Sequence, residues 1–198
     1  MHWKHIAGPV LATLFVFAIV PAPAQVTYAA KEGKLPLTVG VGLSDYSLDW
    51  GGSRRMMGIT AWVDYRFHLP GLLNGLGVEA EGRDLNFDRP SDLTRLRQDV
   101  GLGGVNYQWR HRDRIRPYGK FLVGFGSIDF PDRRNPYYTH DTRTVLASGG
   151  GVDFRVWRNV AVRADYEYQF WRQLFGPNDL NPNGVTVGAV YDFGWHSK

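Results

Sequence analysis

The amino-acid sequence predicts an all-β protein, an eight-stranded antiparallel up-and-down transmembrane β-barrel. Eight stretches alternate apolar and polar residues, which gives each strand two chemically different faces. The polar rows are heavily charged, and both Gly, with 24 residues, and aromatic residues, with 14%, are abundant. No apolar run of about 18 residues follows the N-terminal segment, which excludes a helical membrane span there but leaves membrane strands open.

The N-terminus has the features of a secretory signal peptide. After a polar, basic start, an apolar run extends from Ile6 to Val20, and Ala22-Pro23-Ala24 offers a small-x-small cleavage pattern. The run is short for a membrane-spanning helix, so an uncleaved anchor is the less favoured alternative. The expected divisions are a signal peptide over residues 1–24, an N-terminal periplasmic segment over residues 25–34 and the barrel over residues 35–198.

Turn-forming residues divide the remaining chain into strands. Gly51-Gly52, Pro70-Gly71 and Asn74-Gly75 mark the first two turns, and Arg158-Asn159 marks a tight turn late in the chain. The eight predicted strands cover residues 37–48, 55–67, 76–87, 94–109, 116–128, 142–156, 160–170 and 184–195. Residues 129–141 and 171–182 are expected to be loops.

The first three strands alternate regularly, and the fourth does not. The apolar rows of the first three are Leu37, Val39, Val41 and Leu43, then Met57, Ile59, Ala61, Val63, Tyr65 and Phe67, then Leu76, Val78 and Ala80. In the fourth strand, apolar residues occupy even positions up to Leu102 and odd positions from Val105 onward. We therefore expect a β-bulge at Gly103-Gly104 to reset the faces, and we place Arg97 and Asp99 on the polar face.

The last four strands are more regular, and the seventh is the clearest of all. There Val160, Val162 and Ala164 alternate with Arg163 and Asp165. Aromatic residues recur at the ends of the even-numbered strands, as expected of a girdle at a membrane interface. They are Tyr65, Phe67, Tyr107, Trp109, Phe154, Trp157, Tyr191, Phe193 and Trp195.

The charged residues of the polar rows are expected to face a lumen. They comprise eight acids and six bases: Asp64, Arg66, Glu79, Glu81, Arg83, Arg97, Asp99, Lys120, Asp153, Arg155, Arg163, Asp165, Glu167 and Asp192. An eight-stranded barrel is just wide enough inside for side chains, so these charges should pair and fill it. Two alternatives are a narrow channel for ions or small solutes, with a hydrated lumen, and a secreted soluble lipocalin-like ligand carrier, with these charges outermost.

The last strand carries the pattern polar-x-Gly-x-x-aromatic-x-aromatic at Thr186, Gly188, Tyr191 and Phe193. With the eight strands, this pattern resembles the small eight-stranded outer-membrane β-barrel proteins of the OmpA/OmpX type, over about residues 35 to 195. The resemblance implies the outer membrane of a diderm bacterium, with both termini periplasmic. It also implies insertion by the barrel assembly machinery, which reads that pattern, and a structural or surface-interaction role as a monomer.

The sequence predicts no catalytic, cofactor-binding or metal-binding residues. Cysteine is absent, and a formal charge of +4 with bases scattered among acids does not favour a nucleic-acid partner. His140 lies in an expected outer loop without a Ser or Cys nearby to complete a nucleophile set. No His-x-Ser pair matches the lipid A deacylase barrels, so a lipid A-modifying enzyme is a lower-ranked alternative.

Outer-membrane lipid and lipopolysaccharide are the expected partners. Guanidinium groups bind phosphate in bidentate fashion, so arginines near the predicted outer rim are candidate contacts for lipopolysaccharide head groups. These candidates are Arg54, Arg55, Arg133, Arg134 and Arg172. Ordinary solvated loop charge is the alternative interpretation of the same residues.

Overall fold

The protein's computed structural model describes residues 36–49, 55–87, 96–109, 114–129, 140–174 and 178–193. The strands are β1 (Leu37–Ser47), β2 (Arg55–Arg66), β3 (Leu76–Phe87), β4 (Arg97–Gln108), β5 (Ile115–Asp129), β6 (His140–Arg155), β7 (Val160–Leu174), β8 (Asn178–Leu180) and β9 (Asn183–Asp192). A short 3-10 helix, η1 (Gly71–Gly75), lies in the predicted turn between β2 and β3. The expected signal peptide and periplasmic segment lie outside the described residues.

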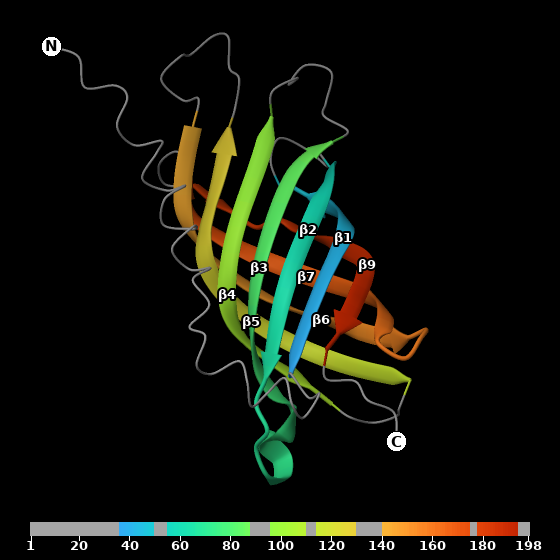
Figure 1. Cartoon of the computed structure of the whole chain (residues 1–198). Coiled ribbons are helices and arrows are strands. Elements are labelled where there is room, and N and C mark those ends of the chain that lie inside the picture. The colour runs from blue at the N-terminus through green and yellow to red at the C-terminus, as the bar shows by residue number, and fades with distance from the viewer. Residues whose placement is uncertain are drawn as a thin grey trace, which may run out of the picture. The chain divides into compact units, whose positions relative to one another are not determined.

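Eight of these strands form a closed antiparallel barrel (Figure 1). Each strand pairs with its neighbour in the chain from β1 to β7, β7 pairs with β9, and β9 returns to β1. The predicted eight-stranded up-and-down topology is confirmed. Among the described residues, no helix is long and apolar enough to span a membrane.

The segment after Phe170 is a correction to the predicted loop over residues 171–182. β7 continues to Leu174, with an irregularity in its pairing between Trp171 and Leu174. Gln173 has a φ of 59° there, a left-handed conformation that is uncommon outside glycine. The short strand β8 then pairs back onto β7. The alternation of apolar and polar residues after Phe170 is too weak to indicate this extension.

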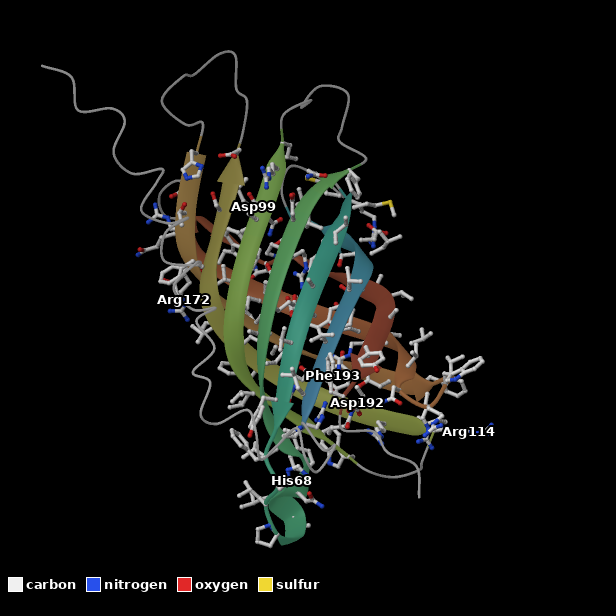
Figure 2. All side chains as sticks on the ribbon, in the orientation of Figure 1. His68, Asp99, Arg114, Arg172, Asp192 and Phe193 are labelled. Atoms are coloured by element: carbon white, nitrogen blue, oxygen red, sulfur yellow. The ribbon has the colours of Figure 1, made fainter. Side chains whose placement is uncertain are left out.

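The described ends of the barrel strands define two ends of the molecule. The Phe193 backbone N–H donates to the Leu37 carbonyl at 2.9 Å, so β1 begins where β9 ends. We call this the terminus end, and the opposite end the far end. Figure 2 shows His68 and Arg114 at the terminus end and Asp99 toward the far end.

Apolar rows face outward and charged rows face inward over the middle of the barrel. In β7, for example, Val162 is 42% exposed, whereas Arg163 is 2% exposed. The exposed aromatics Tyr65, Trp109 and Tyr191 lie at the terminus end. Rings pair edge-to-face between Tyr65 and Phe67, between Tyr107 and Trp109, and between Tyr191 and Phe193. Trp195 lies outside the described residues.

The interior toward the far end is mainly apolar, with Gln98 as a buried polar residue there, and this corrects the prediction for β4. The inner apolar cluster consists of Tyr46, Leu48, Met56, Leu85, Leu96, Val100, Leu102, Leu122, Ile128, Val145, Ala147, Trp171 and Leu180. β4 pairs with β3 and β5 without a register shift, so no bulge resets its faces at Gly103-Gly104. Val100 and Leu102 point inward into the cluster, and Arg97 and Asp99 therefore face outward.

Candidate functional site

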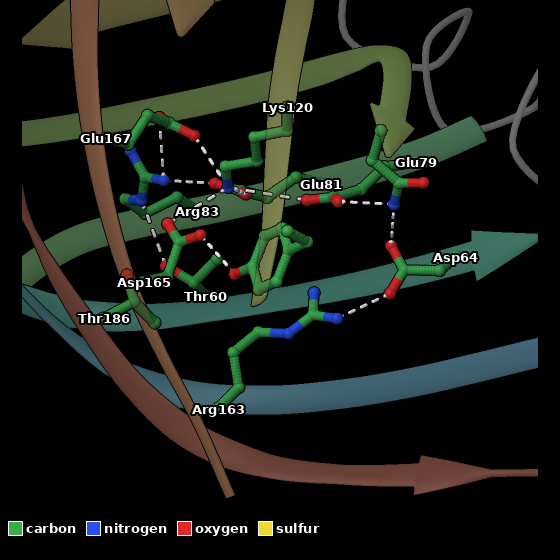
Figure 3. Close-up of polar contacts among 12 residues, drawn as sticks. Thr60, Asp64, Glu79, Glu81, Arg83, Lys120, Arg163, Asp165, Glu167 and Thr186 are labelled. Carbon is green, nitrogen blue, oxygen red and sulfur yellow. Dashed lines mark hydrogen bonds and ion pairs between the residues drawn. The ribbon is translucent and has the colours of Figure 1, made fainter. Parts of the chain in front are cut away.

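A buried lysine lies at the centre of the charged interior. Lys120, on β5, contacts four carboxylates with its Nζ: Glu79 at 3.4 Å, Glu81 at 2.6 Å, Asp165 at 3.2 Å and Glu167 at 2.9 Å. Two of these residues stand on β3 and two on β7. Figure 3 shows the amine reaching into this ring of carboxylates. One side chain thus joins three walls of the barrel.

Arg83 forms the part of the network nearest the inner apolar cluster. Its guanidinium pairs with Glu81 and, at 3.0 Å, with Glu167, while its Nε donates to the Thr60 hydroxyl at 3.0 Å. The Arg83 Cζ also lies 4.0 Å from the centroid of the Tyr46 ring, a distance at which cation–π attraction acts. The Nε and Nη2 donors of this cation therefore point at groups that complement its charge, whereas its Nη1 is buried without a hydrogen-bond partner.

Arg163 forms the part of the network nearest the terminus end. Its Nη2 lies 2.8 Å from Asp64, and its Nε lies 2.7 Å from Asp153. Asn106 donates to Asp64 at 2.9 Å and to Glu79 at 3.0 Å, which connects this part with the Lys120 carboxylates. The network is thus continuous along the barrel axis, because Glu79 also contacts Lys120.

Nine of the fourteen predicted lumen charges are buried inside the barrel, and we call these nine the lumen network. They are Asp64, Glu79, Glu81, Arg83, Lys120, Asp153, Arg163, Asp165 and Glu167. Arg66, Arg155 and Asp192 are part-buried near the terminus end. The remaining two, Arg97 and Asp99, lie outside the barrel, where Arg97 pairs with Asp84 and Asp99 at 3.0 Å each.

Uncharged partners that were not predicted from the sequence complete the network. Gln169 donates to Glu167 at 2.8 Å, and the Trp171 indole donates to Gln169 at 2.8 Å. The Tyr118 hydroxyl donates to Asp165, and Gln108 donates to Asp153 at 3.0 Å. Each stands at an inward position of its strand, so the alternation alone could have indicated them.

The residues of the predicted assembly pattern lie on both faces of β9. Thr186 is buried, with its hydroxyl 2.7 Å from that of Ser44, and Gly188 also faces inward, where an added Cβ would meet the Val41 carbonyl oxygen. Tyr191 and Phe193 face outward, with ring centroids 4.8 Å apart. The pattern thus combines an inward polar-and-glycine pair with an outward aromatic pair.

Two of the five candidate rim arginines lie within the described residues. Arg55 binds Asp45 across the β1–β2 pair, with its Nε 3.0 Å from Oδ1 and 3.1 Å from Oδ2. Arg172 is exposed on β7, and among the described residues it forms no ion pair (Figure 2). Arg54, Arg133 and Arg134 lie outside the described residues.

His140 has polar neighbours that the sequence did not indicate. It begins β6 rather than lying in a loop, and its Nδ1 lies 2.5 Å from Asp129 Oδ1 on β5. Its Nε2 lies 3.1 Å from the Thr142 hydroxyl, and the Ser127 hydroxyl lies 3.4 Å from Nδ1. The expectation that His140 has no Ser or Cys nearby is therefore wrong, because strand pairing brings Ser127 beside it; the Thr142 hydroxyl, two positions along the strand, is a further neighbour.

Comparison with known proteins adds to this geometry. The family model described as "Outer membrane protein beta-barrel domain" matches residues 10–193. The chain belongs to this family. The eight-stranded outer-membrane resemblance expected from the sequence is thereby confirmed, and the outer membrane is the location that the family supports. Among curated proteins, no match was found.

Two solved structures share the fold of this family member. Neisserial surface protein A has a TM-score of 0.61 at 14% identity, over 79% of this chain and 95% of that chain. Ail, the attachment invasion locus protein of Yersinia pestis, has a TM-score of 0.51 at 19% identity, over 78% of this chain and 96% of that chain. At these identities the likeness shows the fold alone.

Proposed function

We propose that this protein is a closed outer-membrane barrel with a structural or surface-interaction role, and that its lumen network fills the interior in place of a channel. The observation that carries the proposal is the set of four carboxylate contacts to Lys120 from β3 and β7. Buried charges of opposite sign keep such contacts, because moving the partners apart would leave each buried charge uncompensated. The walls are therefore fastened to one another across the lumen.

The small residual space supports a closed lumen. The cavity beside Lys120 and Arg163 measures about 10 Å³, and the cavity beside Arg66 and Asp153 also measures about 10 Å³. A cavity needs about 10–15 Å³ to hold one water molecule. Toward the far end, the interior is lined mainly by the inner apolar cluster, with the buried amide of Gln98 level with Leu85 and Ile128, so an ion would find few groups there to replace its hydration shell. The alternative of a narrow channel is therefore the less favoured one.

Planar-bilayer recording tests this proposal. We expect the purified barrel to insert without producing discrete conductance steps in 1 M KCl, because the cavities beside the described lumen network measure only about 10 Å³ each. Insertion is verified independently by protection from protease in the same lipid. Stable, long-lived open steps from verified insertions would favour the channel instead.

We also propose that both termini lie in the periplasm, as the family resemblance implies. Because the number of barrel strands is even, β1 begins and β9 finishes at the same end of the barrel, where exposed aromatics gather. The turn from β6 to β7 at this end is tight, with the Val156 N–H donating to the Val160 carbonyl at 3.0 Å. Short turns typify the periplasmic side of such barrels. The far end is then external.

Lipopolysaccharide is the partner that we propose for the external rim, and Arg172 is the described arginine best suited to bind its phosphates. Arg172→Gln should lower the lipopolysaccharide phosphate retained by purified protein several-fold, because Arg172 has no competing carboxylate among the described residues. Arg97→Gln is the matched control, since the Arg97 guanidinium already pairs with Asp84 and Asp99. Equal retention by wild type and Arg172→Gln would remove Arg172 from the proposal.

A further inference from the structure

Four polar side chains form a compact block on the outer surface of the barrel at the far end. Asp129 lies directly opposite His140 in the β5–β6 ladder, and Ser127 lies directly opposite Thr142. Residues that pair across strands, and residues two positions apart in one strand, point to the same face. All four side chains therefore converge, although the chain between Asp129 and His140 separates their two strands in sequence.

Three of these residues are arranged as acid, base and nucleophile. Asp129 Oδ1 lies 2.5 Å from His140 Nδ1, so the carboxylate accepts a hydrogen bond from Nδ1–H and fixes the tautomer of the ring. His140 Nε2 is then an acceptor, and the Thr142 hydroxyl lies 3.1 Å from it. A hydroxyl that is hydrogen-bonded to a histidine, with the histidine oriented by a carboxylate, is the arrangement that activates oxygen nucleophiles. Ser127 lies 3.4 and 3.5 Å from the two ring nitrogens and is not aligned with either alone.

The block lies where the lipid-facing surface ends toward the far end of the barrel. Phe125, two residues before Ser127 on the same face, is 67% exposed, and Leu146, four residues after Thr142, is also exposed. His140 and Asp129 have side-chain exposures of 59% and 48%. The block thus marks the level where the apolar surface changes to a polar one. The ester linkages of membrane lipids lie at this level, between acyl chains and head groups.

We propose that Thr142, His140 and Asp129 form a hydrolase site for the acyl esters of outer-leaflet lipids, with the far end external. The apolar surface at Phe125 and Leu146 would hold the acyl chain and bring the ester carbonyl to the Thr142 oxygen. Glycerophospholipids and acylated saccharolipids share this ester chemistry. Substrate reaches such a site laterally from the membrane, so the closed lumen is no obstacle.

In the first half of the reaction, the Thr142 oxygen attacks the ester carbonyl carbon and its proton passes to His140 Nε2. Asp129 stabilises the resulting imidazolium through Nδ1–H. The tetrahedral intermediate collapses, the bond from carbonyl carbon to alcohol oxygen breaks, and the alcohol leaves with the Nε2 proton. In the second half, water attacks the acyl-threonine and gives its proton to Nε2. The fatty acid then leaves, and the Thr142 oxygen recovers the proton.

The test uses the full chain in its purified, detergent-solubilised form with two separate substrates. One is mixed micelles of phosphatidylethanolamine and phosphatidylglycerol, and the other is purified lipopolysaccharide. Released fatty acid is measured by mass spectrometry. We expect wild type to release fatty acid from at least one substrate, and the substrate that responds identifies the lipid source. His140→Gln should lower the rate at least about 100-fold, since a positioned base contributes about that much.

Variants at the nucleophile separate catalysis from folding. Thr142→Val should abolish release, and Thr142→Ser should retain it, because a hydroxyl returns at the same place. Val162→Thr, the reverse isosteric exchange on the outward face of β7 toward the terminus end, lies away from the block; it is the control and should keep the wild-type rate. Heat-modifiable migration on a detergent gel verifies that each variant is folded.

A covalent readout assigns the nucleophile. Acid-quenched enzyme should contain a peptide with one acyl group on Thr142, and this adduct should be absent from His140→Gln. Acylation of Ser127 in place of Thr142 would overturn the assignment. Fatty-acid release from neither substrate by folded wild type, or equal rates for wild type and His140→Gln, would show that the block is only a set of cross-strand polar contacts.

Discussion

At the scale of the residue, the interior depends on a small number of fully buried cations. Lys120 has four carboxylate neighbours, and no other described cation forms ion pairs with as many. A buried ion pair adds little net stability compared with an apolar replacement of both partners, but loss of one partner is costly. The surrounding carboxylates make Lys120 the side chain whose removal the barrel should tolerate least.

Lys120→Met tests this dependence. The change keeps the length of the side chain but leaves Glu79, Glu81, Asp165 and Glu167 without their shared cation, so we expect the free energy of unfolding to fall by about 3–5 kcal/mol. Urea titration of the barrel in lipid vesicles, followed by tryptophan fluorescence, measures it. Arg97→Gln breaks only an exposed outer ion pair and should cost less than about 1 kcal/mol. Equal losses in the two variants would contradict a special role for Lys120.

Individual residues also show how far the sequence could be interpreted. Period-two alternation located the charges of β2, β3 and β7, because a strand fixes the face of each residue. It did not locate the contacts of Tyr118 or Gln169, since an uncharged side chain has no charge from which an oppositely charged partner could be inferred. The contacts of His140 with Asp129 and Ser127 depend on the register between β5 and β6, and a single sequence does not state that register, whereas Thr142 lies two residues along the same strand.

At the scale of the element, each strand changes environment along its length. Over the middle of the barrel the outward row is apolar, but at the far end the outward row carries Arg97 and Asp99 while Val100 and Leu102 point inward. This is the pattern of a soluble barrel, and it indicates that the strands continue past the hydrocarbon region. The prediction of a bulge in β4 was wrong because it rested on one environment for the whole strand, whereas β4 passes through two.

Inward glycines set how closely neighbouring strands and side chains approach, and Gly124 of β5 provides a test. A Cβ at Gly124 would lie 1.9 Å from the Gly101 carbonyl oxygen. The backbone would have to move to relieve this clash. Gly124→Ala should therefore lower the free energy of unfolding by about 1–3 kcal/mol. Gly82→Ala is the matched control, because a Cβ at that outward glycine meets nothing within 4 Å. The same urea titration applies, and a Gly124→Ala variant as stable as Gly82→Ala would refute the packing argument.

At the scale of the whole molecule, closure of the sheet joins these features. A barrel leaves no unpaired strand edge in the membrane, where free backbone N–H and C=O groups are costly. The first and last barrel strands, β1 and β9, meet over ten register pairs from Thr38 to Ser47, so the ladder is continuous around the barrel. The number of strands and their order followed from the sequence because each strand pairs with its neighbour in the chain.

The arrangement on which the other features of the barrel depend is that the apolar rows contact lipid and the charged rows face the barrel axis. Because the chain has no cysteine, single cysteines can be spin-labelled without background. Labels at Val41, Val123, Val162 and Val187, with Arg97 as the far-end control, can be compared in lipid vesicles by electron paramagnetic resonance. Our account predicts that oxygen relaxes the four valine-site labels strongly and a water-soluble nickel complex does not, with the reverse at Arg97. Strong relaxation of the valine-site labels by the nickel complex would contradict it.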